Sequence, residues 1–142
     1  MPAHLDAYER PMLADWIARW IEPVAEWREV VCAWLVGDLV EESGPPMYGS
    51  GSFPLEWPAT VTALARRMRP DAAVVPGHGA AVERTFVAAQ QADLQQVADV
   101  IVELHAAGVP AAEAPARGRG RWPFPEDGMA PAVADAYRQL DG

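Results

Sequence analysis

Two polar residues follow predicted strands and could together hold a metal ion. Asp38 comes directly after an apolar run over residues 30–36, and His78 lies in a Pro-Gly-His-Gly sequence after a second apolar run. The glycines on both sides of His78 allow the backbone to bend sharply and bring the imidazole close to a partner. In α/β sheets, ligand sites lie beyond the carboxyl ends of the strands. A carboxylate and an imidazole placed there are suitable ligands for zinc or iron.

The other residues of reactive type have simpler interpretations. His105 falls in the last turn of a predicted long helix, where the helix dipole favours a cation. His4 lies near the chain terminus, and Cys32 lies within the first apolar run, where a thiol acts as a small core side chain. Glu41 and Glu42 are adjacent, and we expect them to be solvated loop residues rather than an acid–base pair.

Composition excludes several classes of protein and chemistry. The chain has 142 residues and a net charge of -9, which argues against nucleic acid or an anionic membrane as a partner. All 11 basic residues are arginine, so Schiff-base and lysine-nucleophile mechanisms are excluded. The single cysteine excludes a disulfide framework and is typical of a reducing compartment. The polar first ten residues do not resemble a secretory signal, and we therefore expect a cytoplasmic protein.

The pattern of apolar residues predicts an α/β layered fold. The continuous run over 30–36, rich in valine, predicts a strand buried on both faces. Further along the chain, apolar spacing, proline and glycine predict alternating helices and strands. The predicted elements are helices over 12–22, 58–68, 83–106 and 130–140, strands over 30–36 and 72–75, a loop over 41–57 and a flexible segment over 110–121.

Two sequence motifs resemble a known family. Val36-Gly37-Asp38-Leu39 resembles the Gly-Asp motif of the metallo-β-lactamase superfamily, and the segment 74–79 resembles its Pro-Gly-His-Gly motif. The stretch 37–138, including Gly-Pro-Pro at 44–46 and Glu-Trp-Pro-Ala-Thr at 56–60, resembles the C-terminal half of hydrolases with that fold. The resemblance implies a partial αββα sandwich, about one αβ half, over residues 30–142. Residues 1–29 would then be a Trp-rich helical extension.

The resemblance also implies a chemistry. Asp38 matches the aspartate that bridges two metal ions in the family, and His78 matches a histidine ligand of the second ion. In the family, zinc ions supply a bound hydroxide that attacks an ester, thioester, lactam or phosphodiester of a small-molecule substrate. The sequence contains no His-x-His-x-Asp-His motif. We therefore expect a truncated form, whose activity would need either ligands from a complementing chain or a metal site unlike that of the family.

A non-catalytic interaction module is the alternative. Four tryptophans, Trp16, Trp20, Trp27 and Trp34, fall within 19 residues and could pack into the core or form an exposed apolar face. A sandwich that lacks one half leaves a sheet face uncovered. The N-terminal helix could fold back over this face, or a second copy of the chain could cover it as a homodimer. A third interpretation is that the motif match is incidental and the chain is another small α/β protein.

Overall fold

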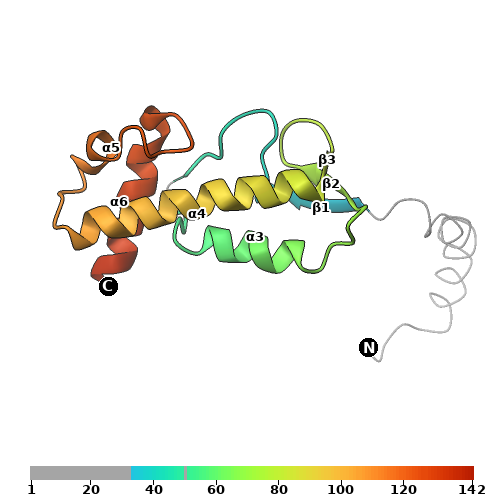
Figure 1. Cartoon of the computed structure of the whole chain (residues 1–142), viewed down its shortest axis with the longest axis horizontal. Helices are drawn as coiled ribbons and strands as arrows, with labels where there is room; N and C mark the ends of the chain where they lie inside the picture. The colour runs from blue at the N-terminus through green and yellow to red at the C-terminus, as the bar shows by residue number, and fades with distance from the viewer. Residues whose placement is uncertain (1–32, 50) are drawn as a thin grey trace, which may run out of the picture. The chain divides into compact units, whose positions relative to one another are not determined.

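The structure, a computed structural model, describes residues 33–49 and 51–142. The predicted helix over 12–22, the extension over 1–29, His4, Cys32 and the first three tryptophans of the cluster lie outside the described residues. The described part is a mixed α/β fold, as predicted (Figure 1). Its elements are β1 (Ala33–Gly37), α3 (Trp57–Ala65), β2 (Ala73–Pro76), β3 (Val82–Glu83), α4 (Arg84–Ala106), α5 (Ala114–Arg117), a 3-10 turn (Glu126–Gly128) and α6 (Met129–Asp141).

The three described strands form one small sheet in the order β1-β2-β3. β1 and β2 are parallel, with Trp34 opposite Val74 and an irregularity between Leu35 and Gly37. The long loop and α3 make the crossover between them, so the predicted strand–loop–helix–strand order is confirmed. β3 pairs antiparallel with β2 and was not predicted, because two residues are too short to give an alternating pattern.

The prediction that the first strand is buried on both faces is wrong for its described residues. Along β1, half-buried side chains alternate with exposed ones, and Leu35 is 82% exposed. The reason is that alternate side chains of a strand point to opposite faces of the sheet, and in both β1 and β2 one of these faces is less covered than the other. In β2, Val74 is fully buried and points to the core.

Helix α4 is the longest element and carries the core. Its predicted inward stripe is confirmed, with Leu94, Val97, Ile101 and Leu104 all buried. Gly108 ends the helix with a φ of 71°, and the N–H of Val109 donates to the carbonyl of Leu104, as in a Schellman motif. α3 lies alongside α4 (Figure 1) and buries Pro58 and Val61. It ends at residue 65, not 68, because residues 66–68 form tighter turns.

The C-terminal elements pack at the end of α4 that lies away from the sheet (Figure 1). The predicted last helix is confirmed as α6, which contacts both α4 and α5 and buries the stripe Met129, Ala132, Val133, Ala136 and Tyr137. The prediction that residues 110–121 are flexible is wrong. They contain α5, Ala114 is fully buried, and the indole N–H of Trp122 donates to the carbonyl of Pro115 at 2.8 Å. The prediction was wrong because a segment rich in alanine and proline can form a packed turn as well as a flexible one.

Candidate metal-binding site and adjoining pocket

The loops that follow β1 and β2 meet at the carboxyl ends of these parallel strands. The N–H of Gly77 donates to the carbonyl of Gly37 at 2.9 Å, and the N–H of Glu42 donates to the carbonyl of His78 at 3.1 Å. These backbone hydrogen bonds fix the two loops against each other. The arrangement brings Asp38 and His78 together, as the strand ends predicted.

Three potential ligands converge at this point. The donor atoms of Asp38, Glu41 and His78 all lie within 4.8 Å of one another. His78 Nδ1 lies 3.0 Å from both carboxylate oxygens of Glu41 and 3.8 Å from Asp38 Oδ1. The Asp38 and His78 side chains are 79% and 66% exposed, whereas Glu41 is only 12% exposed. The cluster is therefore open to solvent on one side and anchored on the other.

Glu41 corrects the sequence prediction. It was predicted to be a solvated loop residue, but its carboxylate is largely buried and contacts His78. Its backbone is fixed by Gln90 of α4, whose side-chain amide accepts from the Glu41 N–H and donates to the Glu41 carbonyl. Glu41 follows Asp38 by three residues, and this spacing could have indicated that both belong to the site. The turn at residues 37–40 brings Asp38 and Glu41 together. The neighbouring Glu42 is exposed, and its carboxylate accepts from the N–H of Ala80.

The glycines on either side of His78 are required by close approach. A Cβ on Gly77 would overlap the Asp38 carboxylate and lie 2.9 Å from the backbone nitrogen of Asp38. Gly79 has a φ of 101°, and a Cβ there would lie 2.7 Å from the backbone nitrogen of Ser43. Both glycines therefore allow the turn after β2 to pack against the loop after β1.

The electrostatics of the cluster favour a cation. The hydrogen bond that His78 donates to Glu41, the charge of Glu41 and the charge of Asp38 together raise the pKa of His78 above its ordinary value of 6.5. Two carboxylates thus stabilise the positive charge of an imidazolium. A metal ion bound through Nδ1 would replace the proton that His78 shares with Glu41.

The donor distances from His78 suit a metal ion such as zinc. Donor atoms about 2.1 Å from a tetrahedral zinc lie about 3.4 Å apart. The distances of 3.0 Å and 3.8 Å from His78 Nδ1 to the two carboxylates bracket that value. Three protein ligands plus an open position is the arrangement of catalytic zinc sites. Nitrogen and oxygen donors of this kind are also accepted by iron and manganese.

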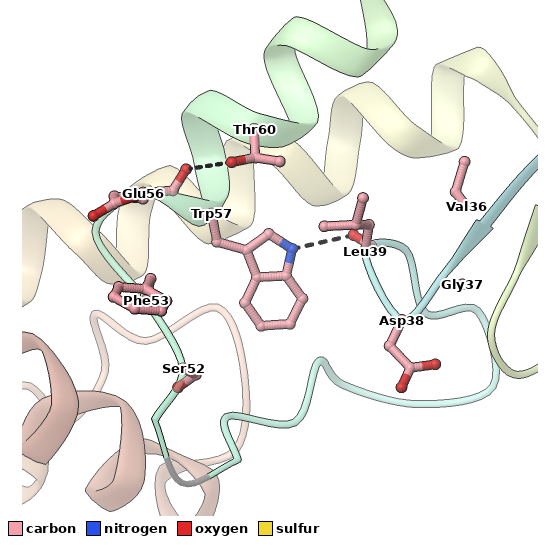
Figure 2. Close-up of a pocket in the computed structure, with 9 residues that line it drawn as sticks. All are labelled: Val36, Gly37, Asp38, Leu39, Ser52, Phe53, Glu56, Trp57 and Thr60. Atoms are coloured by element: carbon pink, nitrogen blue, oxygen red, sulfur yellow. Dashed lines mark hydrogen bonds between the residues drawn. The ribbon is translucent and has the colours of Figure 1, made fainter. Parts of the chain in front are cut away.

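A pocket of about 650 Å³ opens beside Asp38 (Figure 2). Its lining comes from the end of β1, from the long loop and from the first turn of α3. The lining residues are Val36, Gly37, Asp38, Leu39, Ser52, Phe53, Glu56, Trp57 and Thr60. Asp38 belongs to both the ligand cluster and the pocket, so a group bound in the pocket would lie next to the cluster.

The walls of the pocket are held by specific contacts. The indole N–H of Trp57 donates to the carbonyl of Leu39 at 3.2 Å, as Figure 2 shows. Tyr48 packs edge-on against Trp57, with the ring centroids 5.2 Å apart. The buried carboxylate of Asp135, on α6, accepts from both the N–H and the hydroxyl of Ser52. Helix α6 therefore anchors the loop that forms one wall.

His105 is outside the site, as predicted. It lies in the last turn of α4, where Nε2 is 2.9 Å from Asp141 Oδ1 and the ring packs edge-on against Tyr137.

Among the described helices, none is long and apolar enough to cross a membrane. Neither a protein-family model nor a curated protein sequence matches this chain.

Proposed function

We propose that Asp38, Glu41 and His78 bind a zinc ion and that the chain is a metal-dependent hydrolase. The observation that carries the proposal is the convergence of three donor atoms within 4.8 Å, next to a pocket that can hold a substrate. We also propose that the fold is about one αβ half of a metallo-β-lactamase sandwich. The Gly-Asp and Pro-Gly-His-Gly motifs support this assignment, because they supply two of the three ligands.

Each ligand has its own part in the proposed reaction. A divalent cation, when bound, lowers the pKa of a water molecule and polarises a carbonyl or phosphoryl oxygen. Glu41, fixed by Gln90, would supply a carboxylate ligand from the buried side, and His78 would supply an imidazole nitrogen. Asp38 lies on the exposed side and forms part of the pocket wall, so a substrate bound in the pocket would have its reacting group next to the site.

The three ligands found here change what a complementing chain would have to supply. Asp38, Glu41 and His78 supply the three protein ligands of a mononuclear catalytic site. A second ion, as in the two-metal members of the resembled family, would need donors beyond the three that converge among the described residues, and a complementing chain could supply them. We propose a cytoplasmic location on the basis of the single cysteine.

The hydrolase proposal is tested by turnover. Zinc-loaded full-length protein is assayed with a chromogenic ester, thioester, lactam and phosphodiester. We expect hydrolysis of at least one of them, and its loss in His78→Ala but not in His105→Ala. Zinc-loaded protein that hydrolyses none of the four classes, or a His78→Ala variant as active as the native chain, would overturn the hydrolase proposal.

A specific observation favours the interaction module as a second candidate. Leu35, on the open face of β1, is 82% exposed, and the loop residue Met47 is 84% exposed. Exposed apolar side chains of this size mark interaction surfaces when they share a face. Sedimentation of the full chain over a hundredfold concentration range tests this candidate. A dimer that weakens in Leu35→Ser supports it, and a monomer at every concentration rejects self-association through this face.

A further inference from the structure

We propose that the pocket beside Asp38 binds a substrate that carries a positively charged amine on an apolar body. That the bound molecule is the substrate rests on the hydrolase proposed above. That the pocket binds amines rests on the pocket alone.

The size of the pocket suits a small molecule. Its volume of about 650 Å³ lies within the range of about 300–1,000 Å³ typical of ligand pockets. Apolar side chains, chiefly Leu39, Phe53 and Trp57, form most of the wall. An organic ligand could therefore bury an apolar body there.

The charges of the lining select among such ligands. Both ionisable residues in the wall, Asp38 and Glu56, are acidic, and the wall contains no arginine. They come from different elements, one from the end of β1 and the other from the residue that precedes α3. His78 lies 3.8 Å from Asp38, outside the wall, whereas Glu56 forms no ion pair among the described residues. The lining therefore repels an anionic ligand and attracts a cation, chiefly at Glu56. The net charge of -9 acts in the same direction.

The aromatic residues of the wall add a second attraction for a cation. Phe53 is 60% exposed, although phenylalanine is usually buried, and Trp57 is only partly buried. The faces of such rings attract ammonium groups. The indole of Trp57 is oriented by its hydrogen bond to Leu39 and by its contact with Tyr48. Trp57 therefore keeps its orientation before a ligand arrives.

The carboxylate of Glu56 is also fixed by its surroundings. Gln139 of α6 donates from Nε2 to Glu56 Oε1 at 3.4 Å and accepts from the N–H of Leu55. Asp135 holds Ser52 in the same loop. A loop fixed in this way loses little freedom when it binds a ligand.

The two carboxylates have different roles in this proposal. In the view of Figure 2, Trp57 lies between Glu56 and Asp38. Asp38 already faces His78 at 3.8 Å in the metal-free protein, so Glu56 is the carboxylate left to pair with the amine. A substrate would place its ammonium group near Glu56 and the aromatic rings, with its reacting group towards Asp38.

A matched series of probes tests the proposal in metal-free, full-length protein. The probes are 2-phenylethylamine, 2-phenylethanol and 3-phenylpropanoate, which share a phenyl group and differ in charge. Binding is followed by the NMR signal of the Trp57 indole N–H, assigned with Trp57→Phe. We expect the amine to bind about tenfold more tightly than the alcohol and the carboxylate to bind more weakly than both.

Variants separate the roles of charge and aromatic surface. Glu56→Gln should bring the affinity for the amine to within about threefold of that for the alcohol. The matched control is Glu113→Gln, an exposed glutamate of the C-terminal region, which should keep the full preference. Phe53→Leu keeps an apolar side chain but removes the ring, and should weaken binding of the amine more than binding of the alcohol.

The proposal is overturned if the carboxylate probe binds as tightly as the amine, if none of the probes binds, or if Glu56→Gln leaves the preference unchanged. Zinc binding is measured separately on the same samples by equilibrium dialysis. Amine binding without zinc binding would keep the pocket and reject the hydrolase. Zinc binding without amine binding would reject the pocket proposal alone.

Discussion

The side-chain amide of Gln90 forms two hydrogen bonds with the backbone of Glu41, a residue 49 positions earlier in the chain. Its Oε1 accepts from the Glu41 N–H at 3.2 Å, and its Nε2 donates to the Glu41 carbonyl at 2.8 Å. Gln90 is 6% exposed and lies on α4, the helix that carries the core. The helix that carries the core thus fixes the residue that contacts His78.

Gln90→Met tests whether this contact positions the cluster. Methionine keeps the volume but leaves the N–H and carbonyl of Glu41 without their partners, which should cost about 1–3 kcal/mol of stability. We expect the affinity for zinc to fall about tenfold or more, as for other residues that orient metal ligands. The measurement is zinc titration against a competing chelator. Gln95→Met, at an exposed position of the same helix, is the control and should leave zinc affinity unchanged.

Gly77→Ala tests the close approach of the two loops. The added methyl group would collide with the backbone and carboxylate of Asp38, so the loops must separate. We expect a loss of about 1–3 kcal/mol in the free energy of unfolding and weaker zinc binding. Gly44→Ala is the matched control, because no atom lies within 4 Å of a Cβ at Gly44 and its φ is not positive. Equal effects of the two substitutions in urea denaturation would contradict the described packing.

Glu41→Gln tests the electrostatics of metal-free protein. Glu41 is the main cause of the raised pKa of His78, so the substitution should lower that pKa towards 6.5 in an NMR titration of the imidazole. The sign of the linked stability follows. The imidazolium–carboxylate contact stabilises the folded protein below the unfolded pKa of His78, and this contribution is lost as pH rises through the higher folded pKa. Glu42→Gln, whose side chain does not contact the ring, should leave the titration unchanged. A His78 pKa that is the same in native protein and Glu41→Gln would refute the contact.

Tyr48 and Tyr137 are both buried, but they differ in whether the hydroxyl group has a hydrogen-bond partner. The Tyr137 hydroxyl donates to the carbonyl of Val109 at 3.0 Å, whereas the buried Tyr48 hydroxyl has no partner among the described residues. Burial raises the pKa of Tyr48 because the phenolate would be desolvated. We expect Tyr137→Phe to cost about 1 kcal/mol and Tyr48→Phe to be neutral or stabilising. Urea midpoints at unchanged slope provide the measurement, and the reverse order of the two effects would contradict it.

The sequence predicted the elements that have strong local signals. The spacing of Leu94, Val97, Ile101 and Leu104 predicted α4, and Gly108 correctly marked its end. The placement of Asp38 and His78 after parallel strands predicted that they would meet. These features could be predicted because helix periodicity and the end of a strand both depend on residues that are close together in the sequence.

The features that were missed depend on contacts distant in sequence. Glu41 looked like a solvated loop residue because Gln90, which fixes it, lies 49 residues away. The burial of β1 was overestimated because an apolar run does not reveal whether its second face is covered. The pocket wall around Phe53 depends on Asp135 of α6, 83 residues after Ser52. Contacts between residues this far apart in sequence depend on how the helices pack, and local sequence patterns do not predict them.

Zinc content tests the central claim most directly. Full-length protein without a histidine tag is purified without chelators, supplied with zinc, dialysed and analysed for metal per chain. The account predicts about one zinc per chain in the native protein and in His105→Ala, whose imidazole also faces a carboxylate, and little zinc in His78→Ala. Native protein without zinc, or equal zinc in His78→Ala and His105→Ala, would contradict the claim that Asp38, Glu41 and His78 form a metal site.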